Sequence, residues 1–187
     1  MRVLPMGSKQ NETDLSIRVL RVGHRFVRDE RTLTHLCLAS RALGAEAIYL
    51  QEVEPEMLRA MQEVNDGWGG HFQLIESASW KSVIERAKEE GRVVVHLTMY
   101  GIPLQDKASE LRKSRRFLLV VGGPKVPGEL YRLSDYNVAV TSQPHSETAA
   151  LAIALHEIQA GEELKKDFGE SKLRIIPKER GKRVVRI

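Results

Sequence analysis

Short apolar runs alternate along this chain with segments in which apolar residues recur every three or four positions. The apolar runs predict β-strands over residues 17–22, 45–50, 71–75, 93–98, 117–121 and 137–141. The helical periodicity predicts helices over residues 32–43, 55–65, 80–90, 104–113, 127–133 and from a capping Ser146 to about Gln159. Strands that alternate with helices predict an α/β fold with a mostly parallel sheet and helices on both faces.

The two ends of the chain lie outside this alternation. Residues 1–16 show no periodicity and are predicted to form a flexible extension, whereas residues 17–162 are predicted to form the main domain. Within residues 163–187, two alternating runs at 173–176 and 183–187 flank a turn-like segment. This pattern predicts a basic β-hairpin appended to the main domain.

The composition is that of a soluble globular protein, since 42% of the 187 residues are hydrophobic and 29% are charged. The single cysteine, Cys37, excludes an internal disulfide and a cysteine-rich zinc site. The six histidines include no pair at helical spacing, so we expect no metal. The apolar runs are too short to span a membrane, and the N-terminus lacks the apolar region of a signal peptide, so we expect a cytoplasmic protein.

The net charge of +4 is unevenly distributed along the chain. Residues 18–41 contain six arginines against two acidic residues, and residues 165–187 contain nine Lys or Arg against three acidic residues. Two basic ends around an acidic middle favour a polyanionic partner, and arginine in particular favours nucleic acid because it forms bidentate contacts to phosphate. The alternative is a solvated charged surface.

Three predicted strands end in loops of similar character, with the sequences LTMYG (residues 97–101), VVGGPK (120–125) and VTSQPH (140–145). Because the carboxyl ends of parallel strands meet at one edge of a sheet, these loops are expected to lie together and to hold a ligand. They offer glycines, backbone groups and apolar side chains but almost no carboxylate, a set that could hold an adenine. The alternative for the last loop is an ordinary strand–helix turn with Ser146 as N-cap.

Several common catalytic motifs are absent. The chain has no GxGxxG and no GxxxxGK[ST] sequence, so Gly122-Gly123 alone is only weak evidence for a nucleotide site and is also compatible with a plain tight turn. A G-x-S-x-G nucleophile elbow is missing as well, which argues against a serine hydrolase.

An arginine-rich segment follows the first predicted strand. Arg25, Arg28 and Arg31 recur at a spacing of three next to His24. Thr34, His35 and Arg41 follow on the next predicted helix. Such a cluster suits the positioning of a phosphate and the binding of a hydroxyl that must lose a proton, although a solvated basic loop remains the alternative.

Four stretches together resemble a known family: VLRVGHRFVRDERTLTHLCLASRALGA, HLTMYGIP, VVGGPKVPGELYRLSDYNVAV and QPHSETAALAIAL. They are similar to the archaeal tRNA (cytidine-56) 2′-O-methyltransferases of the SPOUT superfamily, from about Ile17 to the C-terminal hairpin. The resemblance implies a deep trefoil knot over about residues 93–160, S-adenosylmethionine bound inside the knot, a homodimer, and methylation of a ribose 2′-OH in the tRNA T-arm.

The resemblance also implies the site residues. The implied cofactor-binding residues are Leu97, Val121, Gly122, Gly123, Pro124, Lys125, Val138, Ala139, Val140, Thr141, Ser142, Gln143, Pro144 and His145. The implied catalytic residues are Arg25 and Arg28 first, then Thr34, His35 and Arg41, with His145 and Ser146 on the other side of the pocket. Pro124 departs from the family's VGAEKVP pattern, because it replaces an acidic residue and removes a backbone N–H.

Other functions remain open at this point. A different SPOUT enzyme would methylate a base nitrogen, and a non-catalytic RNA-binding module would keep the fold without the reaction. A nicotinamide oxidoreductase is disfavoured because the glycine fingerprint and a ribose-binding acid are both missing.

Overall fold

A computed structural model describes residues 15–23, 30–123 and 125–187 of the chain. Within these residues, six parallel strands form one sheet in the order β3-β2-β1-β5-β4-β6. The elements in chain order are β1 (Ser16–Val22), α1 (Glu30–Ala42), β2 (Ala47–Leu50), α2 (Pro55–Trp68), β3 (Gln73–Glu76), α3 (Trp80–Glu89), β4 (Val93–Pro103), α4 (Leu104–Leu111), β5 (Arg116–Gly122), α5 (Gly128–Leu133), β6 (Tyr136–Ala139), α6 (Glu147–Gln159), the 3-10 helix η1 (Glu162–Lys165), β7 (Leu173–Ile175) and β8 (Val184–Arg186).

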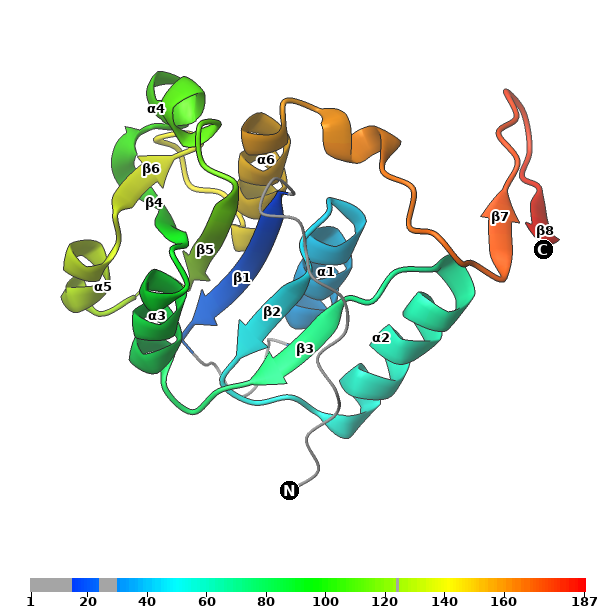
Figure 1. Ribbon diagram of the computed structural model, residues 1–187, viewed down its shortest axis with the longest axis horizontal. Coiled ribbons are helices and arrows are strands. Elements are labelled where there is room, and N and C mark those ends of the chain that lie inside the picture. Colours follow the sequence, from blue (N-terminus) through cyan, green and yellow to red (C-terminus); the bar gives the residue numbers. More distant parts are fainter. Residues whose placement is uncertain (1–14, 24–29, 124) are drawn as a thin grey trace.

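The predicted α/β fold with a mostly parallel sheet is confirmed. Strands β1, β2 and β3 follow one another from the centre of the sheet to one edge. The chain then crosses to β4 in the other half of the sheet, and β5 lies between β4 and β1 and pairs with both. Helices α1 and α6 cover one face of the sheet, and α3 and α5 cover the other (Figure 1). The reversal of strand order between β1 and β5 creates the kind of switch point beside which α/β proteins bind ligands.

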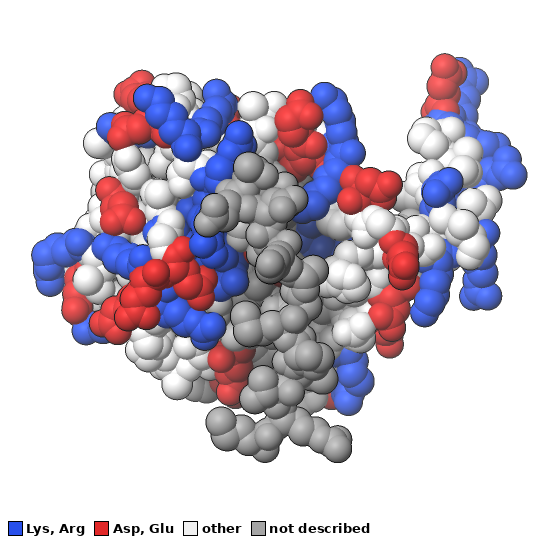
Figure 2. All heavy atoms as spheres, in the orientation of Figure 1, with Lys and Arg blue, Asp and Glu red and all other residues white. Residues whose placement is uncertain are grey.

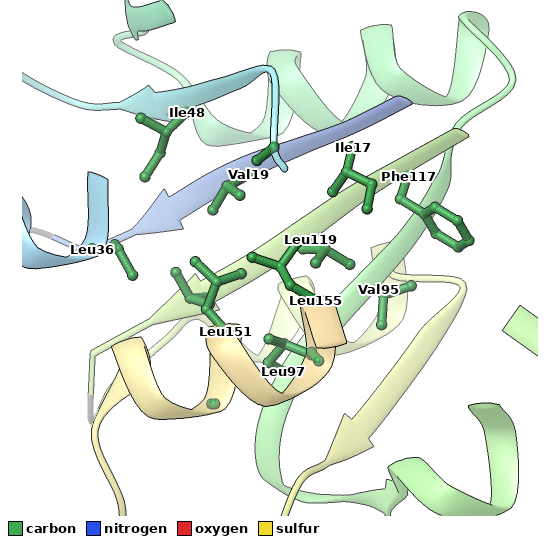
Figure 3. Close-up of a cluster of buried hydrophobic side chains, with 14 of the residues drawn as sticks. Ile17, Val19, Leu36, Ile48, Val95, Leu97, Phe117, Leu119, Leu151 and Leu155 are labelled. Carbon is green, nitrogen blue, oxygen red and sulfur yellow. The ribbon is translucent and has the colours of Figure 1, made fainter. Parts of the chain in front are cut away.

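The central strands are buried on both faces, which explains their continuous apolar sequences. In β1, Ile17 and Val19 enter the core cluster under α1 and α6, whereas Leu20 and Val22 enter the cluster under α3 and α5. Figure 3 shows the first cluster, where Leu151 and Leu155 of α6 pack over the sheet. Successive residues of β1 therefore alternate between the two faces of the sheet.

Strands β7 and β8 form a separate antiparallel pair that stands apart from the main sheet beside α2 (Figure 1). Two contacts join the pair to α2: the Lys172 N–H donates to the Gly67 carbonyl at 3.0 Å, and the Leu173 side chain lies against Gly67. The pair follows η1 and an irregular stretch over residues 166–172.

Several element boundaries differ from the sequence-based expectation, among them those of α2, β4 and β6. Helix α2 continues past the predicted stop and ends only at Gly69, whose φ of +79° and N–H bond to Asn65 terminate the helix. Strand β4 continues to Pro103 through a stretch that reads as a loop. Strand β6 ends at Ala139, two residues early, because the Thr141 hydroxyl accepts from the Gln143 N–H and begins a turn.

Candidate active site

The carboxyl ends of β4, β5 and β6 lie at one edge of the sheet, because β4 is the parallel neighbour of both β5 and β6. Leu97, Val121 and Val138 lie at or near these ends, and all three belong to the same buried cluster. Leu97 is directly opposite Val138 in the strand pair. The structure therefore brings together the three segments that the sequence predicts to share a ligand.

The turn between β6 and α6 is exposed from Thr141 to Ser146. In the described part of the chain, residues 142–145 make no backbone-to-backbone hydrogen bond, although the Gln143 N–H donates to Thr141 Oγ1 at 3.3 Å. The predicted N-cap is confirmed, because Ser146 Oγ accepts from the Ala149 N–H at 3.1 Å. This turn offers a ligand several backbone donors and acceptors next to buried apolar side chains.

The loop after β5 folds back on itself. A Cβ on Gly122 would lie 2.3 Å from Val126 Cγ1, whereas a Cβ on Gly123 would meet nothing within 4 Å. Gly122 thus permits the tight return, and Gly123 leaves open space beside its backbone. Lys125 is exposed, and Pro124 lies outside the described residues.

Strand β4 contains a large bulge at this edge of the sheet, between Leu97 and Ile102. Val138 of β6 pairs with both Leu97 and Ile102, so the residues between them leave the ladder. Tyr100, in the bulge, is 78% exposed. Where β4 returns to β6, Gly101 lies so close that a Cβ would be 2.5 Å from the Val138 backbone nitrogen. The return of β4 therefore requires glycine at this position.

We expect Gly101→Ala to lower the free energy of unfolding by about 1–3 kcal/mol, because the added methyl group meets backbone atoms that cannot rotate away. Urea unfolding followed by circular dichroism measures this change. Gly128→Ala is the matched control, since a Cβ there meets nothing within 4 Å, and we expect a change within about 0.5 kcal/mol. Equal stabilities of the two variants would contradict the account of the bulge.

A chain of polar side chains lies beneath the bulge, and sequence reasoning did not identify it. Thr98 Oγ1 and Tyr131 Oη share a hydrogen bond of 3.0 Å, Asn137 Nδ2 donates to the Tyr131 carbonyl, and His96 Nδ1 donates to Asn137 Oδ1 at 2.9 Å. Burial lowers the pKa of His96, although its bond to Asn137 opposes the shift. His96 is thus held neutral as a fixed support of the β4 and β6 ends.

A buried ion pair joins the end of β1 to the start of α6. Arg21 Nε lies 3.0 Å from Glu147 Oε1, and the two side chains are only 8% and 10% exposed. Arg21 also donates to the Gly23 carbonyl at 2.9 Å. The nearby Cys37 thiol has its pKa raised to about 12 by burial, against the opposing charge of Arg21, so it stays protonated.

The catalytic residues implied by the resemblance fall in different places. Arg25 and Arg28 lie outside the described residues, in the segment that joins β1 to α1. Thr34, which is half-buried, and His35, which is exposed, lie in the first half of α1.

Arg41 is not brought to this edge. It lies at the far end of α1, is buried, and donates to Asn65 Oδ1 and to the Gly69 carbonyl. Its guanidinium lies 5.0 Å from the centre of the Phe168 ring, and it lines a separate cavity of about 570 Å³ beside the amino-terminal ends of β2 and β3. The helix carries Arg41 away from the strand ends, so we leave it out of the proposed site.

Two further findings concern the described residues only. No helix within residues 15–23, 30–123 and 125–187 is long and apolar enough to cross a membrane. Over the same ranges, no three His, Cys, Asp or Glu side chains gather as metal ligands would.

Comparison with known proteins gives close sequence relatives. A family model described as tRNA ribose 2′-O-methyltransferase, aTrm56, matches residues 68–185. A protein of Nitrosopumilus maritimus named tRNA (cytidine(56)-2′-O)-methyltransferase is 49% identical over 168 residues, which cover 90% of this chain and 95% of the relative. A protein of the same name from Methanococcoides burtonii is 48% identical over 169 residues, with the same two coverages.

Solved structures show the same fold at low sequence identity. The SpoU methyltransferase AviRb of Streptomyces viridochromogenes, in complex with the cofactor AdoMet, gives a TM-score of 0.60 at 14% identity over 82% of this chain. The match covers 62% of the AviRb chain, less than two thirds of its length. The A. aeolicus TrmH/SpoU tRNA modifying enzyme gives a TM-score of 0.56 at 15% identity and covers 89% of this chain and 83% of that one.

Proposed function

The chain belongs to the family of tRNA ribose 2′-O-methyltransferases, and we propose on this premise that it methylates the ribose 2′-hydroxyl of cytidine 56 in the T-loop of tRNA. The observation that carries the proposal is the 49% identity to the Nitrosopumilus maritimus protein named for this reaction, over 95% of that protein's length. A tRNA substrate makes the cytoplasm the expected compartment.

S-adenosylmethionine is the proposed methyl donor, held by Leu97 and by residues 121–125 and 138–145. The described residues fit this group. The exposed backbone groups of residues 142–145 can bind the edge of an adenine, and Leu97 and Val138 provide apolar surface for its faces. The similarity to a SpoU methyltransferase crystallised with AdoMet supports the same choice.

When bound, S-adenosylmethionine supplies a methyl group on a positively charged sulfur. The ribose 2′-oxygen forms the new O–CH₃ bond as the S–CH₃ bond breaks, and the 2′-hydroxyl loses its proton. We assign Arg25 and Arg28 to hold the 2′-hydroxyl and to stabilise the negative charge that develops on its oxygen, because a guanidinium does not accept a proton at neutral pH. The proton then passes to a phosphate or to a histidine, with His35 and His145 as the candidates.

We also propose that residues 93–160 form the deep trefoil knot expected from the resemblance. Two observations support it. Strand β4 returns past Val138 after its bulge, and Gly101 lies against the backbone of Asn137 and Val138 without room for a side chain. Small residues on α6, among them Ala150 and Ala154, allow the same close packing behind these strands.

Nucleoside analysis separates this function from its rivals. Unmodified tRNA is incubated with the protein and methyl-labelled S-adenosylmethionine and then digested to nucleosides, and we expect the label in 2′-O-methylcytidine. Label on a base nitrogen would identify a different SPOUT reaction instead. No binding of the labelled cofactor at millimolar concentration would favour a non-catalytic RNA-binding module.

We propose a homodimer formed through α1 and α6, which pack against each other and expose apolar side chains. Leu38 on α1 is 39% exposed and Ile153 on α6 is 44% exposed. We expect Leu38→Glu/Ile153→Glu to be monomeric by light scattering, because two buried carboxylates per protomer would oppose association. Leu58→Glu on α2, where Leu58 is 46% exposed, is the control and should stay dimeric. A double variant that remains dimeric would place the interface elsewhere.

A further inference from the structure

The positive charge of this protein is concentrated in its last residues. We call residues 172–187 the C-terminal arm. The arm contains one carboxylate, Glu179, and seven cations: Lys172, Arg174, Lys178, Arg180, Lys182, Arg183 and Arg186. The whole chain carries a net charge of only +4, so the remainder of the chain is net negative. A surface that attracts a polyanion is therefore expected on the arm, in addition to the arginine-rich segment that follows the first strand.

The seven cations of the arm are exposed and are not neutralised by neighbouring carboxylates. Each of them is exposed in the structure, and none forms an ion pair among the described residues. Some cations on the body differ in this respect: Arg59, Lys81, Lys88 and Lys107 each lie within 3.2 Å of a carboxylate oxygen. Figure 2 shows the arm's Lys and Arg side chains spread over a projection of the surface.

The arm is also held in a fixed shape away from the strand ends of the candidate active site. The β7–β8 ladder pairs Leu173 with Arg186 and Ile175 with Val184. Leu173 anchors the pair against α2, whereas the connection over residues 176–183, which carries four of the cations, points away from the body (Figure 1). A ribbon of this kind can follow a phosphate backbone while the methylated nucleotide occupies another part of the protein.

We propose that the C-terminal arm is a second tRNA-binding surface, which contacts backbone phosphates at a distance from the methylated nucleotide and contributes affinity rather than catalysis. This inference rests on the proposed function for the identity of the RNA. Contacts to phosphate position a nucleic acid without reading its sequence, and they make binding steeply salt-dependent. Specificity for the target nucleotide then stays with the active site.

The test is equilibrium binding of unmodified tRNA, which does not depend on methyl transfer. The arm variant is Lys178→Gln/Arg180→Gln/Lys182→Gln/Arg183→Gln, which leaves the residues of both strands unchanged. The matched control, Arg59→Gln/Lys81→Gln/Lys88→Gln/Lys107→Gln, removes the same number of charges from the body. Circular dichroism and light scattering confirm that both variants keep the fold and the oligomeric state of the parent.

We expect the arm variant to bind tRNA about tenfold more weakly at 0.15 M salt. The magnitude of the slope of log affinity against log salt should fall by about 3, because each lost phosphate contact removes roughly 0.7–0.9 from it. The control should stay close to the parent. In methylation assays, KM for tRNA should rise while kcat stays unchanged.

Equal affinity and slope in arm variant and control would overturn the proposal. A changed oligomeric state with an unchanged slope would overturn it as well, since the arm would then serve a second copy of this chain. If the parent binds tRNA through the arm but transfers no methyl group, the proposed function fails and the arm proposal stands.

Discussion

Replacing Glu147 by Ala is expected to lower the free energy of unfolding by about 3–5 kcal/mol. Glu147 Oε1 lies 3.0 Å from Arg21 Nε, and both side chains are almost completely buried. The substitution removes a carboxylate partner of the Arg21 guanidinium, which remains buried and still bears the free-energy cost of leaving water. The second carboxylate oxygen, Glu147 Oε2, is buried without a hydrogen bond in the described structure, so its loss breaks no hydrogen bond and offsets part of this penalty.

Chemical unfolding of Glu147→Ala and of a matched surface variant measures the difference. Glu56→Ala is the control, because the Arg59–Glu56 pair has a similar distance of 2.8 Å but is 67% and 80% exposed. An exposed pair of this kind contributes only about 0–1 kcal/mol. If Glu147→Ala were as mild as Glu56→Ala, the buried pair would not be what holds β1 to α6.

The position of this pair links stability to function. Arg21 is near the end of β1, two residues before Gly23, and Glu147 begins α6 directly after the exposed turn of residues 141–146. A loosened pair would therefore displace the proposed cofactor-binding turn. We expect Glu147→Ala to weaken S-adenosylmethionine binding even at temperatures where the variant remains folded.

The second large effect is expected for Arg25→Ala/Arg28→Ala. If these guanidinium groups hold the ribose 2′-hydroxyl and stabilise its developing charge, kcat for ribose methylation should fall by about 10²–10⁴-fold. Binding of S-adenosylmethionine should not change, because neither residue belongs to the proposed cofactor segments. Single-turnover transfer of a labelled methyl group to tRNA measures the first quantity, and equilibrium dialysis of the cofactor measures the second.

A double variant on the body controls for the loss of two positive charges. Arg59→Ala/Arg86→Ala removes two exposed arginines, each of which faces a glutamate. This control should methylate tRNA at nearly the parent rate. If Arg25→Ala/Arg28→Ala also kept the parent rate, the assignment of these two arginines would be wrong.

The fold was largely predictable because its central strands are buried on both faces. Runs such as 93–95 and 117–121 are apolar throughout, and the helices between them show clear periodicity. The end of β4 was not predictable by the same logic. Met99, Tyr100 and Gly101 read as a loop, and only the pairing of Val138 with both Leu97 and Ile102 shows that the strand resumes.

The candidate site was predictable only in part. Parallel strands bring Leu97, Val121 and Val138 to one edge, so the sequence could place these segments together. Arg21 and Glu147 are 126 positions apart and carry no local sign of their pairing. Arg41 lies away from this edge for a geometric reason, since a helix rises about 1.5 Å per residue and the last turn of α1, which contains Arg41, is distant from its first turn.

Methyl transfer to a defined tRNA tests the central claim most directly. Two tRNA transcripts that differ only at position 56, with cytidine in one and 2′-deoxycytidine in the other, are incubated with the protein and methyl-labelled S-adenosylmethionine. We predict one methyl group per molecule on the cytidine transcript and none on the deoxycytidine transcript, which lacks the accepting oxygen. Equal labelling of the two transcripts would contradict the account.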